Sequence, residues 1–286
     1  MKYALTIISV GLATVLAGCG NSDNSLSGNP PQAPASSAGT TVGKITGFGS
    51  IYVNGIEFDT SGAAYQVDDA VGADDSALAV GMVVKVRGAR SADGSTGSAS
   101  AIFYDDDIEG VVRNIGVDAT DASVMVFQVM GLSVMANANT TNFKGEDDAD
   151  FSFATIANGD HVEISGEYNG DVLIASYIEK QEAGDSDYEA RGTVDQYNGT
   201  DRFVLVLRNS STLDIVLDAA AVIPNAGIVN GQFVEVEGSI AEPVAAPTEL
   251  LATKVELEDN DRFDDDDGDV DLRGYLNFDA DAETWS

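Results

Sequence analysis

Gly81-Met-Val-Val-Lys-Val-Arg-Gly88 is the first of three copies of one short pattern. The other two copies are Gly159-Asp-His-Val-Glu-Ile-Ser-Gly166 and Gly231-Gln-Phe-Val-Glu-Val-Glu-Gly238. In each copy two apolar residues alternate with polar ones, which is typical of a strand that buries one face. The glycines at both ends indicate a sharp turn or a close approach to another strand. The apolar pairs expected in the cores are Val84 and Val86, Val162 and Ile164, and Val234 and Val236.

Each copy belongs to a longer unit with a constant order of elements. A strand opens the unit at Gly43, Gly110 or Gly192, and a hairpin follows it. The hairpin turn of the first unit is Asn54-Gly55, the strongest short hairpin signal. The eight-residue phrase is then the fourth strand, and a fifth strand closes the unit. Repeats of this length indicate small tandem domains instead of a solenoid. The expected fifth strands are Ala99–Tyr104, Leu173–Ile178 and Leu251–Leu257.

Three strands, a short connector and two further strands follow the order of the OB-fold, a small Greek-key β-barrel. A generic antiparallel sandwich or meander is the alternative. The barrel is favoured because a unit of under about 80 residues has to bury its apolar faces without exposing long strand edges. The sequence therefore predicts an all-β protein of tandem OB-fold-like barrels. The expected barrels are residues 42–107, 108–182 and 190–258, after a signal peptide and a flexible tether.

The N-terminal residues have the features of a targeting signal. Lys2 precedes an apolar stretch, Tyr3 to Leu16, that is too short to span a bilayer as a stable anchor. The next residues complete Leu16-Ala17-Gly18-Cys19, which resembles the lipobox of bacterial lipoproteins. The resemblance implies cleavage of residues 1–18 and acylation of Cys19, the single cysteine, which would anchor the protein in a membrane. An ordinary secretory signal with a chance cysteine is the alternative.

Residues 19–41 are rich in Asn, Ser, Pro and Gly, and we expect them to form a solvated tether. Gly20, and not Asp, follows the cysteine, which is similar to lipoproteins that are sent on to the outer membrane. The expected location is therefore the cell envelope, with a lipid anchor in the outer membrane of a Gram-negative bacterium.

The strong negative charge of the chain makes some classes of partner unsuitable. The chain has 48 acidic and 14 basic residues, a net charge of −34, and 44% hydrophobic residues. Nucleic acid is an unsuitable partner for such a chain, because phosphate binding needs a basic face. The acidity fits a solubilised surface, an exterior rich in divalent cations, or a salty habitat. The expected partners are the membrane, through acylated Cys19, and an envelope protein or polysaccharide.

A family resemblance rests mainly on the run Gly47-Phe-Gly-Ser-Ile-Tyr-Val-Asn-Gly-Ile56. Together with the first glycine phrase and the strand around Ala101-Ile102, this run resembles the domain of unknown function 5666. The first unit carries the resemblance best, and the second and third are weaker variants. Members are typically envelope proteins of bacteria, often with several tandem copies. The resemblance implies no activity, substrate or catalytic residue.

Two segments follow the third unit. Residues 259–272 are expected to form an acidic linker. Residues 273–286 are expected to be a truncated fourth repeat or a lone strand, because Arg273-Gly-Tyr-Leu-Asn-Phe278 resembles an opening strand. Truncation is preferred, since the strand that would follow is missing.

The sequence offers no candidate catalytic residue. The single histidine, His161, occupies in its phrase the position of Val83 and Phe233, so we expect it to pack or to face solvent. Without a second histidine or a free thiol, the sequence excludes catalytic triads, thiolate chemistry and zinc sites of the His/Cys type. Carboxylate pairs for glycoside hydrolysis remain open.

Acidic runs lie between the units and offer the hard oxygen ligands that Ca²⁺ prefers. Asp105–Asp107 and Glu109 form the first run, residues 182–189 contain the second, and residues 256–271 contain the third. The third run matches part of an EF-hand loop, but no Glu closes it. A solvated, self-repelling linker is the alternative. A bound cation is expected to stiffen the joints between barrels. The candidate Ca²⁺ ligands are Asp265, Asp267, Asp269 and Asp271.

OB-like barrels bind oligosaccharides, peptides or single strands on the face of strands two and three. Phe48 and Tyr52 are candidate stacking groups there, although ordinary packing in a strand is the alternative for Tyr52. The sequence therefore predicts a non-catalytic envelope lipoprotein that acts as a binding or structural module. The alternative function is a carbohydrate-active or other hydrolytic accessory protein that uses paired carboxylates.

Overall fold

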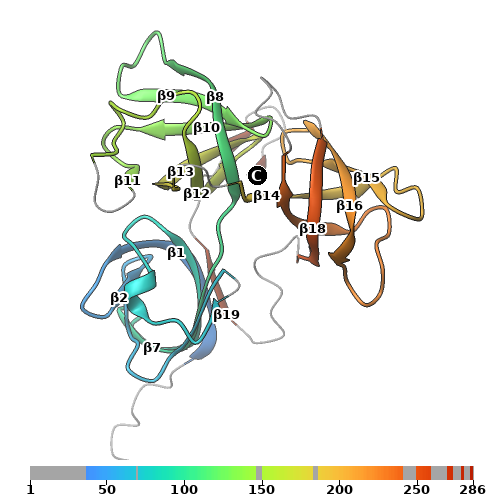
Figure 1. Cartoon of the computed structure of the whole chain (residues 1–286). Coiled ribbons are helices and arrows are strands. Elements are labelled where there is room, and N and C mark those ends of the chain that lie inside the picture. Colours follow the sequence, from blue (N-terminus) through green and yellow to red (C-terminus); the bar gives the residue numbers. More distant parts are fainter. Residues whose placement is uncertain are drawn as a thin grey trace, which may run out of the picture. The chain divides into compact units, whose positions relative to one another are not determined.

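The computed structural model describes residues 37–68, 70–145, 150–182, 186–240, 249–258, 269–272, 278–279 and 284–285. These residues are mostly β-strand, and they contain one 3₁₀ turn, η1 (Asp75–Ala77). Three small barrels follow one another along the chain (Figure 1). Within the described residues, no helix has the length and apolar character needed to cross a membrane.

The first barrel has the strand order of the OB-fold. β1 pairs with both β2 and β6, β3 pairs with β2 and β7, and β7 pairs with β6, so the sheet closes on itself. The pairing of β3 with β7 is parallel and the other pairings of this ring are antiparallel. The strands of this barrel are β1 (Ser37–Gly47), β2 (Ile51–Val53), β3 (Ile56–Asp59), β4 (Ala64–Val67), β5 (Ala70–Val71), β6 (Val83–Arg90) and β7 (Thr96–Tyr104).

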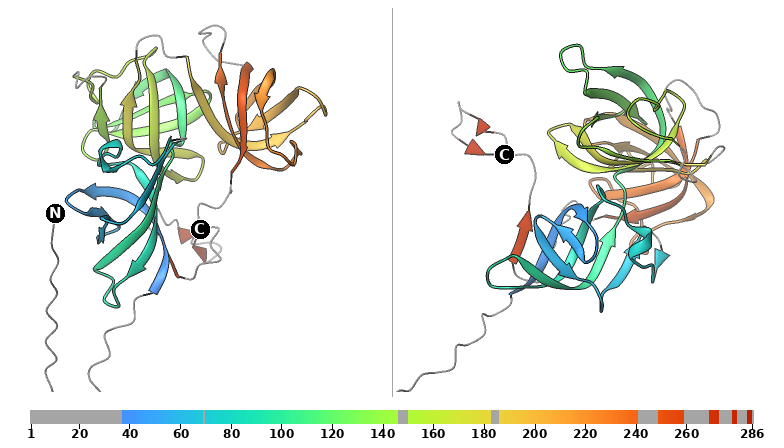
Figure 2. Two further views of the ribbon diagram at one scale, coloured as in Figure 1. Left: turned by 60° about the horizontal axis from the view of Figure 1, so that its bottom comes forward. Right: turned by 90° about the vertical axis from the view of Figure 1, so that its left-hand side faces the viewer.

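The second and third barrels repeat this order. Figure 2 shows the barrels from two further sides. Their parallel pairs are β10 with β13 and β16 with β18. The structure thus confirms the predicted class of tandem OB-fold-like barrels. The strands of the second barrel are β8 (Ile108–Val117), β9 (Val124–Val129), β10 (Leu132–Asn137), β11 (Asn142–Lys144), β12 (His161–Asn169) and β13 (Val172–Lys180). Those of the third are β14 (Tyr188–Asp195), β15 (Arg202–Val206), β16 (Thr212–Val222), β17 (Phe233–Ser239) and β18 (Glu249–Leu257).

The apolar pairs of the repeated phrase lie inside the barrels, as predicted. All six of these Val and Ile side chains are at most 1% exposed. The expected hairpins are also present. Asn54 and Gly55 have φ angles of 54° and 79°, and Met130 and Gly131 have angles of 47° and 89°, which is the backbone of a two-residue hairpin turn.

The two glycines of the phrase have different roles. The first one has a positive φ in every copy, 107° at Gly81, 97° at Gly159 and 89° at Gly231. The second one, Gly88, Gly166 or Gly238, lies at a break in register with the fifth strand. A Cβ at this second glycine would lie only 2.1 to 2.3 Å from a carbonyl oxygen of the fifth strand. Both expectations for these glycines, a sharp turn and a close approach, are therefore confirmed.

The barrels contact one another through specific polar groups. β8 pairs with β14 over two residues, Glu109 with Glu189 and Ile108 with Ala190, so the second and third barrels share a ladder. The first barrel keeps its own sheet. It is joined to the second by hydrogen bonds that include one from Ser176 Oγ to the carbonyl oxygen of Gly81, at 2.6 Å.

The N-terminal boundary of the first barrel differs from the prediction. β1 begins at Ser37, inside the segment expected to be tether, and pairs with β6 from Ser37–Arg90 onward. The small polar residues of this segment suggested a linker, but backbone pairing does not require apolar side chains. Thr40 and Thr41 are also buried. Residues 1–36, which include the predicted signal and Cys19, lie outside the described residues.

The segments after the third barrel also contain strands. β19 (Asp269–Leu272) pairs in parallel with Gly39–Val42 of β1, so the end of the predicted acidic linker extends the first sheet. β20 (Phe278–Asp279) pairs with β21 (Thr284–Trp285). The other residues of the predicted fourth repeat, including Arg273, lie outside the described residues.

Candidate functional site

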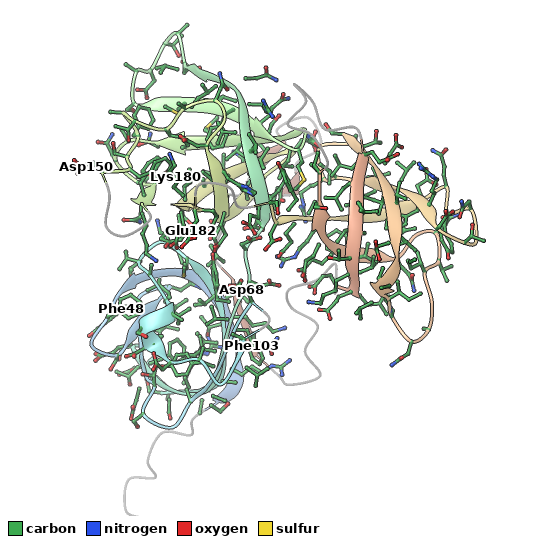
Figure 3. All side chains as sticks on the ribbon, in the orientation of Figure 1. Phe48, Asp68, Phe103, Asp150, Lys180 and Glu182 are labelled. Atoms are coloured by element: carbon green, nitrogen blue, oxygen red, sulfur yellow. The ribbon has the colours of Figure 1, made fainter. Side chains whose placement is uncertain are left out.

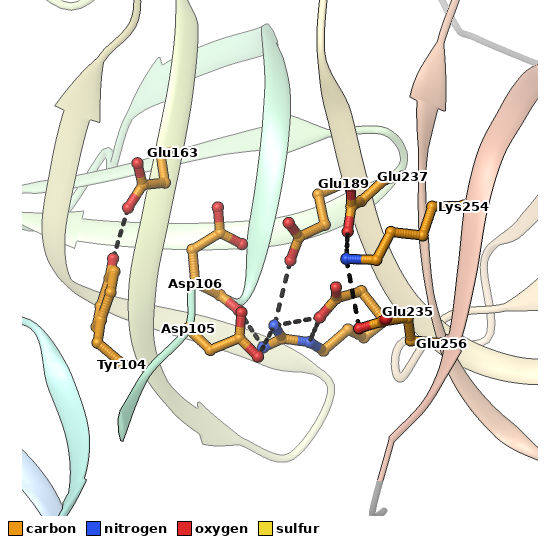
Figure 4. A network of polar contacts seen from close by, with 10 residues as sticks. Tyr104, Asp105, Asp106, Glu163, Glu189, Glu235, Glu237, Lys254 and Glu256 are labelled. Carbon is orange, nitrogen blue, oxygen red and sulfur yellow. Dashed lines mark hydrogen bonds and ion pairs between the residues drawn. The ribbon is translucent and has the colours of Figure 1, made fainter. Parts of the chain in front are cut away.

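Arg191, in β14 of the third barrel, is the centre of a polar network with several carboxylates, which Figure 4 draws. Its side chain is only 11% exposed. The guanidinium donates to Glu235 from Nε at 2.8 Å and from Nη2 at 2.5 Å, and to Glu189 from Nη2 at 3.2 Å. It also pairs with the carboxylate of Asp105 and donates to the carbonyl oxygen of Asp106. One side chain of the third barrel therefore holds the segment that leaves the first.

This segment, Asp105 to Asp107, connects β7 to β8. The Asp107 carboxylate accepts a hydrogen bond from the backbone N–H of Gly166 at 2.8 Å, at the bulge of the second barrel. The backbone N–H of Asp107 donates to the carbonyl oxygen of Ile164, also at 2.8 Å. These bonds fix the segment on the second barrel, so that Asp105 and Asp106 lie next to Arg191.

Glu235 and Glu237 come from the repeated phrase of the third barrel. They alternate with Val234 and Val236, so their side chains leave the barrel on the opposite face of β17. Lys254 of β18 donates to Glu237 at 2.6 Å and lies 3.3 Å from a carboxylate oxygen of Glu256. Although both glutamates lie on the outer face of the barrel, Glu235 is only 5% exposed, because this face lies in the network.

A second link connects the first barrel to the second. The hydroxyl of Tyr104, at the end of β7, donates to Glu163 at 2.6 Å, and Gln181 donates to the other oxygen of Glu163 at 2.9 Å. Glu163 and Glu235 have the same position in their respective copies of the phrase. Corresponding faces of two repeats therefore line the same cavity, and Figure 4 shows both glutamates.

These groups line a cavity of about 950 Å³ to which all three barrels contribute. Thirteen of the lining residues are acidic and three are basic, namely Lys85, Arg191 and Arg208. Aromatic side chains, among them Phe103 and Tyr168, complete the wall. The cavity is therefore polar and strongly acidic, whereas the interior of each barrel is apolar.

Burial changes the protonation of these acids. Burial, followed by the carboxylates of Glu189 and Glu163, raises the pKa of Asp106 well above its usual value. Burial and the Glu235 carboxylate likewise raise the pKa of Glu189. Burial alone would lower the pKa of Arg191, but the carboxylates around it, with Asp105 and Glu235 foremost, outweigh burial and raise it. The cluster contains more negative charge than Arg191 and Lys254 can balance.

One atom of the cluster has no hydrogen-bond partner. Asp106 is 3% exposed, and its Oδ1 accepts no hydrogen bond within the described part of the chain. The side chain lines the cavity and lies beside Glu189 in Figure 4. Buried carboxylate oxygens are usually hydrogen-bonded or bound to a metal, so the surroundings of Asp106 call for a further partner.

Carboxylates at metal-binding distances occur twice in this cluster. In one group Glu189, Glu235 and Glu237 each place an oxygen within 4.8 Å of the others. In the other group Asp105 and Glu258 do the same with Glu235. Hard oxygen ligands of this kind suit Ca²⁺ better than softer transition metals.

Asp68 lies on the first barrel, close to this cluster (Figure 3). Its side chain reaches solvent, but partial burial and the carboxylates of Glu163 and Asp105 raise its pKa from 3.8 to about 7. The folded protein therefore binds this proton more tightly than the unfolded chain does. Between about pH 4 and pH 7, this difference makes the free energy of unfolding fall as pH rises.

We predict that Asp68→Asn stabilises the protein at pH 7.5 and has much less effect at pH 4, where the folded state carries a neutral side chain and the unfolded chain is only partly ionised. Asn also tolerates the positive φ of 47° at this position. Urea unfolding in EDTA at the two pH values measures the effect. The exposed Asp171→Asn variant removes the same charge elsewhere, and equal pH dependence in the two variants would contradict this account of Asp68.

The predicted site residues lie mostly elsewhere. Phe48 is 42% exposed, in the turn after β1, and in Figure 3 it lies on the other side of the barrel from Asp68. Tyr52 is a half-buried residue of β2. Of the candidate Ca²⁺ ligands, Asp265 and Asp267 lie outside the described residues, and Asp269 and Asp271 belong to β19.

His161 is buried and packs against the ring of Tyr188, with a distance of 4.9 Å between ring centroids. Its Nε2 lies 3.6 Å from Glu109. This placement fits the packing role that its exchange with Val83 and Phe233 predicts.

The structure brings together one residue from each of the three predicted acidic runs. Asp105 of the first, Glu189 of the second and Glu256 of the third all belong to the network around Arg191 and Lys254. Sequence reasoning did not identify Arg191 or Glu235 as site residues. The sequence feature that could have indicated Glu235 is the polar face of the phrase, because Glu163 and Glu235 recur at the same position of it. The sequence does not show, however, that the polar faces of different repeats lie close together.

Comparison with known proteins finds one matching family model, in two tandem segments. Residues 41–102 and 109–179 match the family model described as Domain of unknown function (DUF5666). These segments correspond to most of the first two barrels. No curated protein matches the chain.

Two solved structures resemble it at low identity. A cold-shock-domain segment of Drosophila Unr is 12% identical, with 79% of this chain and 100% of that chain covered and a TM-score of 0.23. A deletion mutant of the single-stranded DNA-binding protein from Thermus aquaticus is 10% identical, with 80% and 97% covered and a TM-score of 0.23.

Proposed function

Because the chain is a DUF5666-like tandem-repeat protein, we propose that it is a non-catalytic binding module of the bacterial cell envelope. The observation that carries the proposal is the cavity to which all three barrels contribute, with acidic, basic and aromatic side chains in its wall. Ligand sites are commonly concave, with a few polar groups among aromatic ones. We propose an envelope polysaccharide or protein as the ligand, and no nucleic acid, because carboxylates dominate the wall.

The proposed location in the cell envelope rests on the sequence alone. Leu16-Ala17-Gly18-Cys19 supports an acyl anchor on Cys19, and Gly20 supports export to the outer membrane. Cell fractionation tests this part of the proposal. The wild-type chain is expected in the outer-membrane fraction, and Cys19→Ser is expected to leave it. A wild-type chain that is released without detergent would contradict the lipid anchor.

Titration calorimetry of envelope polysaccharides against the mature chain, residues 19–286, tests the binding function. We expect saturable binding, which Phe103→Ala weakens about tenfold because an aromatic contact worth roughly 1–1.5 kcal/mol is lost. Phe103 lines the cavity, whereas Phe48 lies outside it on the same barrel. Phe48→Ala is therefore the matched control and should bind like the wild type. Absence of saturable binding, or equal weakening by both variants, would contradict a ligand in this cavity.

One observation favours hydrolysis as a second candidate. Asp106, whose pKa is raised by burial, lies beside the carboxylate of Glu189 in the cavity. A protonated acid near a second carboxylate is the pair that glycosidases use. Assays with chromogenic glycosides and esters separate the candidates. Turnover that disappears in Asp106→Asn would favour the hydrolase, and binding without turnover would favour the module.

A further inference from the structure

Three carboxylates of the third barrel offer oxygens that the neighbouring basic side chains do not use. Arg191 bonds Oε1 of Glu189 and Oε2 of Glu235, and Lys254 bonds Oε1 of Glu237. At Glu235 and Glu237 these bonds use only one of the two carboxylate oxygens, and the side chain of Glu189 is also hydrogen-bonded to Asp106. The three groups are already within 4.8 Å of one another, so one ion can reach all of them with small side-chain movements.

Asp106 adds an independent observation. It comes from the segment between the first two barrels, and its buried Oδ1 lacks a hydrogen-bond donor within the described residues. It lines the same cavity, and burial together with the neighbouring Glu189 carboxylate raises its pKa. Further carboxylates around an unsatisfied oxygen repel it, whereas a cation would satisfy it. The geometry therefore favours a positive ligand at this point.

The chemistry of the wall indicates which cation fits. Ca²⁺ takes six to eight oxygen ligands at about 2.3–2.6 Å and tolerates irregular geometry. Mg²⁺ requires a near-ideal octahedron, and Zn²⁺ prefers His and Cys. No His or Cys is among the described residues that line the cavity. Carboxylates from separate strands and a linker, supplemented by water, match the irregular coordination of Ca²⁺ best.

We propose that Asp106, Glu189, Glu235 and Glu237 bind one Ca²⁺ ion where the three barrels meet. The inference rests on the proposed function, because it names a ligand of the same cavity. The ion ties the segment that follows the first barrel to two strands of the third, so it stiffens the joint between barrels. The proposed Ca²⁺ site thus lies in the joint itself, a different place from the acidic run around Asp265 and Asp267.

Calorimetric titration of CaCl₂ into the mature chain, after dialysis against EDTA at pH 7.5, tests the site. We expect one ion to bind and the melting temperature to rise. Asp106→Asn is expected to weaken Ca²⁺ binding at least tenfold, because one charged ligand is lost. The melting temperature without Ca²⁺ should change little, because Asn has nearly the same size and shape as Asp. If Asp106 had a purely structural role, the variant would also melt at a lower temperature without Ca²⁺.

Two control variants locate the ion. Asp171→Asn removes an exposed charge outside the cavity, and Asp265→Asn combined with Asp267→Asn removes the EF-hand-like ligands. Both are expected to bind Ca²⁺ like the wild type. A loss of binding in the double variant would overturn the proposed site, and so would the absence of heat and of a thermal shift at millimolar Ca²⁺.

The remaining outcomes separate this inference from the proposed function. If NaCl at the same ionic strength raised the melting temperature equally, the stabilisation by CaCl₂ would be due to charge screening, and the proposed site would be overturned. Polysaccharide binding that persists in EDTA, in a chain that binds no Ca²⁺, would overturn only the Ca²⁺ site. Absence of both kinds of binding would overturn the proposed function as well.

Discussion

Replacement of Arg191 by Met is expected to lower the free energy of unfolding by about 3–5 kcal/mol at pH 7.5. The guanidinium is buried and bonds Glu235, Glu189, Asp105 and the carbonyl oxygen of Asp106. Its removal leaves several carboxylates in a low-dielectric site without a counter-charge. Urea unfolding at pH 7.5 measures the loss.

The control for this prediction is Arg202→Met in the same barrel. Arg202 pairs with Glu249 at 3.0 Å, but both side chains are 54% exposed. An exposed ion pair contributes at most about 1 kcal/mol, since water screens it. Similar losses in the two variants would mean that the Arg191 network stabilises the protein no more than an ordinary surface ion pair does.

Replacement of Gly166 by Ala is expected to destabilise the second barrel by about 3 kcal/mol, near the upper end of what overpacking costs. Gly166 lies at the bulge between β12 and β13, where a Cβ would be 2.3 Å from the carbonyl oxygen of Ile174. The strands must separate to admit the methyl group. This separation also disturbs the bond from the Gly166 N–H to Asp107, which holds the segment between barrels. Thermal unfolding followed by circular dichroism measures the loss.

Gly116→Ala is the matched control, because Gly116 lies on β8 of the same barrel and no atom lies within 4 Å of a Cβ built there. We expect this variant to stay within about 0.5 kcal/mol of the wild type, as is usual for surface substitutions. A Gly166→Ala variant as stable as Gly116→Ala would show that the repeated phrase does not need its second glycine for close approach.

The local part of the fold could be predicted from the sequence. Alternation placed Val84 and Val86, with their counterparts, in the cores, and Asn54-Gly55 located the first hairpin. These features depend on neighbouring residues and on the two-residue period of a strand. The order of strands then left few closed arrangements, and the OB-fold was among them.

The candidate site could not be predicted in the same way. Arg191 and Asp105 are far apart in the chain, and their contact depends on how the barrels pack, which no periodicity encodes. Composition also misled at Ser37, because a strand that pairs through its backbone can have the small polar residues of a linker. The acidic runs did indicate the joints between barrels, but the ligand geometry at those joints depends on Glu235 and Glu237, which come from inside a repeat.

The most direct test of the central claim is the anomalous diffraction of crystals grown with CaCl₂, measured at long wavelength, where Ca²⁺ scatters anomalously. The account predicts a single strong anomalous peak among the carboxylates of Asp106, Glu189, Glu235 and Glu237. A cavity without such a peak at millimolar Ca²⁺, or a peak only at the acidic run around Asp265, would contradict it.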